Sequence, residues 1–319
     1  MHTTPQAPRS HVRAVTGLCV LLLIAALGVA GCGDSSSGPD ERPHVVATTP
    51  VLGDLVRAVV GDRADVQVLM PNGADPHEYQ ASARDASDLQ KADLILQNGL
   101  GLESGIQDAI ARAEDRGTPT FTVTDHVTLR ALQHDEEGEH AEDDDHDHGS
   151  MDPHVWMDPI LMADMIPDLA SAITDETGID TAPRATATGR RLRTLTRELQ
   201  VIADRVPESE RRLVTGHDSM GYFAARFGFT IIGAVIPSVS SEGAASAGEL
   251  ADLRDLMRTE NAHVIGIEPA TSADVARALA DEADAQVIEM PTNTIPDGGT
   301  YEDMMRLLMT RVVGALRAG

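Results

Sequence analysis

Short apolar runs rich in β-branched residues alternate along the chain with longer segments whose apolar residues recur at helical spacing. The first such pair is "HVVATT" at residues 44–49, followed by "PVLGDLVRAVVGD" at residues 50–62. The alternation continues, with strands predicted at 64–70, 93–99 and 118–124 and helices predicted at 83–92 and 102–117. Strands that alternate with helices form parallel sheets through right-handed crossovers, so this half of the chain predicts one α/β lobe.

Two long segments with helical periodicity, 159–178 and 183–206, interrupt this alternation. The second is amphipathic and rich in arginine, which suits a helix that connects two halves. Beyond it the pattern resumes, with strands predicted at 212–216, 229–236, 263–269 and 286–290 and helices predicted at 220–228, 246–261, 272–283 and 301–316. The predicted fold class is α/β, with two lobes, each a mostly parallel sheet flanked by helices, joined by one long rigid helix.

The amino-terminal segment differs from both halves. Arg9 and Arg13 precede an apolar run of fourteen residues, Leu18–Gly31, which is too short to cross a bilayer comfortably and is typical of a secretory signal. The run ends in "VAGC", which resembles a bacterial lipobox and implies cleavage before Cys32 and lipidation of its thiol. The alternative is an ordinary thiol behind a signal peptide. Cys19 would leave with the signal, so no internal disulfide is expected.

These patterns together predict the domain organisation. The polar stretch "GDSSSGPDERP" reads as a flexible spacer. The predicted boundaries are a lipoprotein signal peptide at 1–31, a flexible tether at 32–43, an N-terminal lobe at 44–155, a helical connector at 156–209 and a C-terminal lobe at 210–319.

The formal net charge of −26 narrows the range of partners. Such a chain repels nucleic-acid phosphates and anionic lipid surfaces, so no nucleic-acid partner is expected and cations are the natural ligands. Much of the charge is local, because nine acidic residues and four histidines fall within the segment 134–150. We predict a solvated loop there that collects metal ions weakly; the alternative is an insertion without a role.

Three of the twelve histidines lie where a predicted strand or loop meets a helix, which is where ligand groups gather on open α/β sheets. His77 lies in "PNGADPHEYQASARD", His154 lies in "MDPHVWMDP", and His217 directly follows the strand "RLVTG". The triplet "DPH" occurs twice, 77 residues apart, and its proline stiffens the backbone before each histidine. Asp152 or Asp158 is placed to orient the imidazole of His154.

The motifs "NGADPHEYQASARD", "MDPHVWMDP" and "TGHDSMGYFAARFGF", followed by "GGTYEDMMR", resemble in order those of the metal-binding solute-binding proteins of bacterial ABC transporters. These are zinc and manganese receptors with two lobes and a rigid connecting helix, and the similarity covers essentially the whole mature chain. The resemblance implies that His77, His154 and His217 are metal ligands and that both lobes bind the metal. It also implies a cognate ABC permease with its ATPase, a monomeric receptor, and a lipid anchor at Cys32 on the outer face of the cytoplasmic membrane.

The fourth ligand is where the sequence departs from that family. Many relatives have an aspartate in a "T-D-S" context, but the matching stretch here is "PTNTIPDGGTY", with Asn293 in that place. Asn293 offers a neutral carbonyl oxygen, Asp297 lies four residues later, and water is a further alternative. Asp297 is preferred because of its charge. Glu268, in "IEP", is a strand-end carboxylate expected to cap or orient rather than to bind the metal.

Three imidazoles with at most one carboxylate favour a four-coordinate Zn²⁺ site, with Mn²⁺ as second choice because it prefers more oxygen ligands. We therefore predict extracytoplasmic capture of Zn²⁺ and its delivery to an ABC permease, and no enzymatic activity. One alternative is a secreted zinc-dependent hydrolase, since three histidines with an open position can activate water, but no HExxH motif is present. Others are a manganese receptor of the same class and a metal-buffering or adhesion lipoprotein that works without a transporter.

Overall fold

The computed structural model describes residues 1–2, 42–132, 151–241, 243–268 and 273–319. The fold lies within the compact unit Arg42–Gly319. The expectations for the signal peptide, for lipidation of Cys32 and for the acidic loop concern segments outside the described residues. Among the residues that are described, no helix combines the length and the apolar character that crossing a membrane requires.

The first lobe is built on four parallel strands. They are β1 (His44–Ala47), β2 (Asp65–Val68), β3 (Leu94–Gln97) and β4 (Thr120–Thr122), in the spatial order β2-β1-β3-β4. The central strand β1 pairs in register with both neighbours, so that Val45 lies opposite Val66 on one side and Leu94 on the other. The crossovers contain α2 (Pro50–Val60), α3 (Ala83–Leu89) and α4 (Ser104–Glu114). Because the sheet is parallel, the carboxyl ends of all four strands lie along one edge.

The second lobe repeats this arrangement. Its strands are β5 (Arg212–Thr215), β6 (Thr230–Ala234), β7 (Val264–Ile267) and β8 (Gln286–Glu289), all parallel and in the order β6-β5-β7-β8. The helices are α7 (Gly221–Phe227), α8 (Ala247–Glu260), α9 (Ala273–Ala283) and α10 (Tyr301–Leu316). The predicted fold class, two parallel-sheet lobes flanked by helices, is confirmed.

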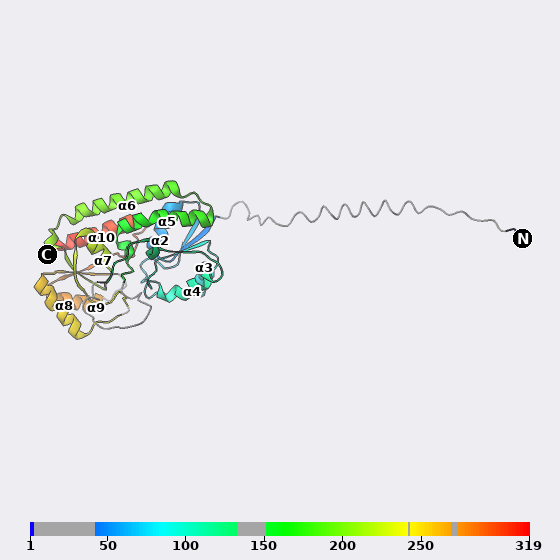
Figure 1. Cartoon of the computed structure of the whole chain (residues 1–319). Coiled ribbons are helices and arrows are strands. Elements are labelled where there is room, and N and C mark those ends of the chain that lie inside the picture. Colours follow the sequence, from blue (N-terminus) through cyan, green and yellow to red (C-terminus); the bar gives the residue numbers. More distant parts are fainter. Residues whose placement is uncertain (3–41, 133–150, 242, 269–272) are drawn as a thin grey trace. The chain divides into compact units, whose positions relative to one another are not determined.

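Two long helices connect the lobes. Helix α5 (Pro159–Thr177) begins with Asp158 accepting a hydrogen bond from the Ile160 amide and with Pro159 in its first turn, and it ends at Gly178, whose φ is +71°. It packs alongside α6 (Ala182–Ala203), as Figure 1 shows. Helix α6 also contacts α2 of the first lobe and α7 and α10 of the second. A continuous helix of 22 residues that touches both lobes is a stiff connection.

The buried apolar side chains form three clusters. One includes Ile106 and belongs to the first lobe, and one includes Leu253 and belongs to the second. The third, which we call the shared core, is continuous through both lobes and the connector; its fully buried members include Leu52, Leu192, Phe223 and Tyr301. The two lobes are therefore joined by apolar packing as well as by the chain.

Candidate metal centre

Three imidazoles from distant parts of the chain converge on one point. His77 lies in the loop after β2, His154 directly precedes the short 3₁₀ turn η3 (Val155–Met157), and His217 lies two residues beyond the end of β5. The Nε2 atom of His154 is 3.3 Å from that of His77 and 3.4 Å from that of His217. Each ring offers a nitrogen within 4.8 Å of the others. Within the described ranges this is the one group of three or more His, Cys, Asp or Glu side chains whose ligand atoms gather in this way.

The two Asp-Pro-His triplets adopt the same local turn. The Oδ1 atom of Asp75 accepts a hydrogen bond of 2.9 Å from the backbone amide of His77. Oδ1 of Asp152 accepts a bond of the same length from the amide of His154. An aspartate that bonds to the amide two residues later forms an Asx turn, and the intervening proline fixes one more backbone angle. The repeated triplet thus gives each histidine a defined backbone before any contact with the rest of the protein.

The imidazole of His154 has a defined orientation. Its Nδ1 lies 2.8 Å from Oδ1 of Asp152, and both side chains are 2% exposed. A carboxylate accepts hydrogen bonds only, so this contact places the proton on Nδ1 and leaves the lone pair on Nε2. The carbonyl oxygen of Pro153 accepts a hydrogen bond of 2.8 Å from the Asn98 side chain, at the end of β3. The first lobe therefore holds both the ring and the backbone of His154.

Glu268, at the end of β7, supports His217 in the second lobe. Its Oε2 lies 3.4 Å from Nδ1 of His217, and its Oε1 accepts a hydrogen bond of 2.6 Å from the Ser219 hydroxyl. Burial raises the pKa of Glu268, but His217 and Ser219 outweigh that effect and lower it overall. Burial likewise lowers the pKa of His217, but Glu268 outweighs it and raises the pKa above 6.5. The carboxylate thus faces Nδ1 and leaves Nε2 directed toward the other two imidazoles.

His77 has the opposite electrostatic environment. Burial, and after it the neighbouring His154 and His217, together lower its pKa from 6.5 to about 3. The ring therefore stays neutral over the whole physiological range. A neutral imidazole is the form that donates a lone pair to a metal ion.

The spacing of the imidazoles fits a first-row metal ion. Zn²⁺ binds imidazole nitrogen at about 2.0–2.1 Å in tetrahedral geometry, which separates two ligand nitrogens by about 3.3–3.4 Å. The two Nε2 separations from His154 are 3.3 and 3.4 Å. Both separations from His154 thus match a tetrahedral site, and the ligand nitrogens of His77 and His217 lie within 4.8 Å of each other.

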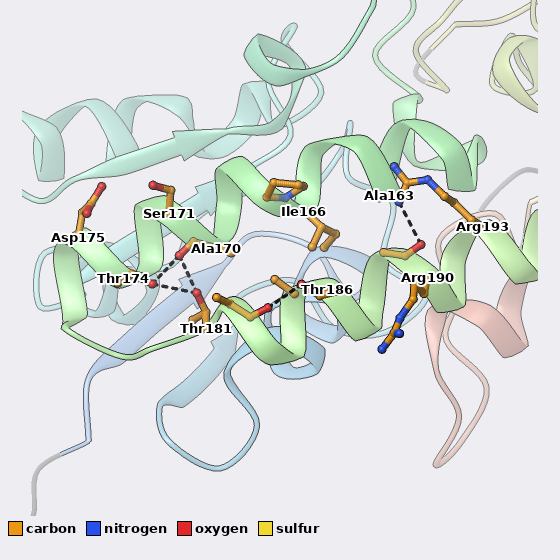
Figure 2. Close-up of a pocket in the computed structure, with 14 residues that line it drawn as sticks. Ala163, Ile166, Ala170, Ser171, Thr174, Asp175, Thr181, Thr186, Arg190 and Arg193 are labelled. Carbon is orange, nitrogen blue, oxygen red and sulfur yellow. Dashed lines mark hydrogen bonds between the residues drawn. The ribbon is translucent and has the colours of Figure 1, made fainter.

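The cavity between the rings is small. Its volume is about 20 Å³, and it is lined by Asp75, Pro76, His77, His154, Trp156, His217, Ser219, Glu268, Thr292 and Asn293. That volume holds one water-sized species. A larger groove of about 500 Å³ lies between α5 and α6 (Figure 2), but it shares no residue with the cavity and contains no histidine or cysteine. A bare ion fits the small cavity, and an organic substrate does not.

The structure separates the candidates for a fourth ligand. Asn293 and Glu268 line the cavity, whereas Asp297 is exposed and lines a different surface depression, with Asp54 and Asn72. The reason is a tight turn in which the Gly299 amide bonds to the carbonyl of Pro296 and directs Asp297 toward solvent. Asp297, the fourth ligand preferred from the sequence, therefore does not line the cavity that holds the three histidines. Asp158 also has another role, since it caps α5 and forms a bidentate pair with Arg226.

Two features of the site were not anticipated from the sequence. Asp75 lines the cavity and accepts a hydrogen bond from Ser241 of the second lobe. The repeated Asp-Pro-His triplet was the available signal, because it gives Asp75 the same position relative to His77 that Asp152 has relative to His154. Trp156 ties the His154 turn to the second lobe, because its indole nitrogen donates a hydrogen bond of 2.7 Å to the carbonyl of Thr292. A single buried tryptophan two residues after a candidate ligand was the available signal for that contact.

Comparison with known proteins gives a consistent picture. Residues 45–315 match the family described as ZnuA, zinc-uptake complex component A, periplasmic. The high-affinity zinc uptake system protein ZnuA of Bacillus subtilis is 27% identical, over 83% of this chain and 83% of its own length. The manganese-binding lipoprotein MntA of the same organism is 25% identical, over 94% of this chain and 99% of its own length. Among solved structures, the periplasmic zinc-binding protein TroA of Treponema pallidum superposes with a TM-score of 0.73 at 27% identity, covering 86% of this chain and 99% of that one.

Proposed function

The chain belongs to the ZnuA family, zinc-uptake complex component A, and on that premise we propose that it captures Zn²⁺ outside the cytoplasmic membrane and delivers it to an ABC permease. As a member of this family it is a metal-binding substrate-binding protein of an ABC transporter and not an enzyme. The convergence of three buried imidazoles, two of whose nitrogen separations match a tetrahedral site, supports this function. His77, His154 and His217 are the proposed ligands.

The chemistry of the cavity favours zinc as the cargo. Its strongest donors are three imidazole nitrogens, which suit Zn²⁺, whereas Mn²⁺ prefers carboxylate and other oxygen ligands. Two carboxylates line the cavity, but their oxygens have other partners: those of Asp75 bond to the His77 amide and to Ser241, and those of Glu268 face Ser219 and His217. Binding a metal through either carboxylate would break these contacts.

We propose Asn293 as the fourth ligand, through its side-chain oxygen. Its Nδ2 atom donates to the carbonyl of Ala74, which holds the amide at the edge of the cavity. Its Oδ1 has only a long contact of 3.5 Å with the Thr294 hydroxyl, so that oxygen remains the least engaged among the amide and carboxylate oxygens of the cavity. A neutral oxygen completes a tetrahedral zinc site without adding charge.

Manganese is the second candidate, because MntA is a relative over nearly the whole chain and because Asp75 and Glu268 are close enough to join a site with more oxygen ligands. A direct competition decides between them. Purified protein loaded with equal concentrations of Zn²⁺ and Mn²⁺ should retain zinc, as read by elemental analysis. Retention of manganese would overturn the choice of cargo but not the ligand set.

Calorimetry of single variants tests the ligands, in the full chain and in a chain lacking residues 134–149. His77→Ala, His154→Ala and His217→Ala should each weaken zinc binding by about 100-fold or more, because each removes one of the few direct bonds to the metal. Asn293→Ala should weaken it by about tenfold and Asp297→Ala, the matched control, by less than twofold. Deleting 134–149 should leave the tight site intact. An unchanged affinity in any one of the three histidine variants would remove that residue from the site.

The remaining parts of the proposal concern the cellular setting. We propose a lipid anchor at Cys32 and a monomeric receptor that works with a permease and its ATPase. The acidic surface supports neither nucleic-acid binding nor adsorption to anionic lipid, so the anchor would supply the membrane attachment. A Cys32→Ala variant should leave the membrane fraction of expressing cells and appear in the soluble extracytoplasmic fraction.

A further inference from the structure

A turn in the first lobe is hydrogen-bonded across the cleft to a loop in the second. Residues Pro71–Ala74 form the turn, in which the Ala74 amide bonds to the Pro71 carbonyl and Gly73 has φ +81°, the conformation of a type II turn. Asn72, the second residue of the turn, is exposed. Opposite it lies the segment after β8 that contains Asn293 and Ile295.

Asn72 pairs with both backbone groups of Ile295. Its Nδ2 donates to the Ile295 carbonyl at 2.7 Å, and its Oδ1 accepts from the Ile295 amide at 2.8 Å. A third bond of 2.9 Å runs in the same region from Nδ2 of Asn293 to the carbonyl of Ala74. We call these three bonds, made by Asn72, Ala74, Asn293 and Ile295, the interlobe latch.

The latch is directly connected to the candidate metal ligands. Ala74 lies three residues before His77, and the intervening Asp75 accepts a hydrogen bond from Ser241 of the second lobe. On the other side, Thr292 accepts the indole bond from Trp156, two residues beyond His154. The loop after β8 therefore contacts both histidine loops of the first lobe.

The rest of the molecule restricts where the site can open. The shared core and the continuous helix α6 join the lobes on the connector side, so that separating them there would expose apolar surface. The latch, in contrast, consists of hydrogen bonds, and Asn72 itself is exposed. Water can replace such bonds at small net cost, which is what a reversible contact requires.

We propose that Asn72 is a positioning residue that controls how fast the site exchanges its metal ion, because its paired bonds to Ile295 must break before the His77 loop can move away from His217 in the second lobe. This inference rests on the proposed function. It adds a kinetic role for a side chain that does not itself touch the ion.

Release kinetics of the full chain test the inference. The protein, loaded with less than one equivalent of Zn²⁺, is mixed with an excess of a chromophoric chelator in a stopped-flow instrument. Asn72→Ala should release zinc about tenfold faster than the wild type, as expected for loss of two hydrogen bonds of ordinary net strength. Because an opened site also admits the ion faster, the dissociation constant should change by less than threefold. A missing ligand would instead raise the dissociation constant in step with the release rate.

Two further variants serve as controls. Asn72→Asp keeps the acceptor for the Ile295 amide and loses the donor, so its release rate should be intermediate. Gln200→Ala removes an amide whose hydrogen bond stays at the end of α6, where Asp204 caps the helix, and should release zinc at the wild-type rate. A wild-type release rate in Asn72→Ala, or a dissociation constant that rises in step with the release rate, would overturn the inference.

Hydrogen exchange separates this inference from the proposed function. The Ile295 amide should exchange about tenfold faster in Asn72→Ala than in the wild type, with no metal present. If the wild type fails to bind zinc, the proposed function is overturned, and the exchange rate still decides whether the latch exists.

Discussion

The two Asp-Pro-His loops share a local structure and differ in what surrounds them. Each has the aspartate bonded to the histidine amide at 2.9 Å, and each has an aromatic residue two positions after the histidine, Tyr79 in the first and Trp156 in the second. In the second loop Asp152 also accepts a hydrogen bond from the imidazole of His154. In the first loop Asp75 turns its other oxygen to Ser241 in the second lobe. The same short motif thus fixes the backbone in both places, and its neighbours decide the chemistry of each ring.

The largest expected effect that tests this comparison comes from the aspartates. Asp152→Asn keeps the turn but weakens the acceptor for Nδ1 of His154, so zinc affinity should fall by about 10- to 100-fold. Asp75→Asn keeps the same turn and has no hydrogen bond to an imidazole to lose, so its affinity should stay within about threefold of the wild type. Isothermal titration of both variants measures the difference. Equal losses would mean that the aspartates act through the backbone alone.

The protonation of His77 gives the next largest effect, in the metal-free protein. Its folded pKa of about 3 lies below the ordinary value of 6.5, so in that window the unfolded chain binds a proton that the folded chain does not. As the pH is lowered from 7 to 5, the free energy of unfolding of the wild type should therefore decrease by about 1–2 kcal/mol relative to that of His77→Gln. Urea unfolding of both proteins across this range gives the slope.

His217 provides a control of opposite sign for that experiment. The pKa of His217 is raised above 6.5, mainly because Glu268 outweighs the effect of burial. The charged imidazole therefore stabilises the fold fully below pH 6.5, and this stabilisation is lost as the pH rises through the folded pKa. His217→Gln should therefore be most destabilised at acidic pH. Parallel slopes in the two variants would contradict the different environments assigned to the two rings.

The smallest expected effect concerns the aromatic residues. Trp156→Phe removes the hydrogen bond to Thr292 of the second lobe and should reduce zinc affinity by about threefold, along with a stability loss of about 1 kcal/mol. Tyr79→Phe removes bonds to Leu69 and Asp85, which lie within the first lobe, so stability should fall slightly while zinc affinity stays unchanged. Titration and thermal melting of the pair separate the two outcomes. A loss of affinity in Tyr79→Phe would show that the first-lobe loop is less independent than its contacts indicate.

Much of the fold was accessible from the sequence because its signals are local. Apolar periodicity, β-branched runs and caps such as Ser82 with Asp85 mark the elements, and the structure has a helix or strand in each of the predicted segments. The three histidines were identifiable for the same reason: each follows a strand or a stiff turn. The features that the sequence could not predict depend on contacts between segments far apart in the chain.

The fourth ligand illustrates that limit. Charge favours Asp297 over Asn293, and sequence spacing does not separate them. The turn at Pro296–Gly299 and the bond from Asn293 to Ala74, 219 positions away, decide which side chain faces the cavity. The role of Glu268 was closer to expectation, because a carboxylate at the end of a parallel strand lies at the edge where ligand groups collect.

The shared core also bears on how the protein denatures. Its side chains come from both lobes and from the connector, including Leu52, Leu192 and Tyr301, so neither half can lose its packing while the other keeps a complete interior. We therefore expect heating to melt the molecule in one cooperative transition rather than lobe by lobe. Truncated halves expressed separately should then aggregate, because each would present to water a large apolar face that the other normally covers.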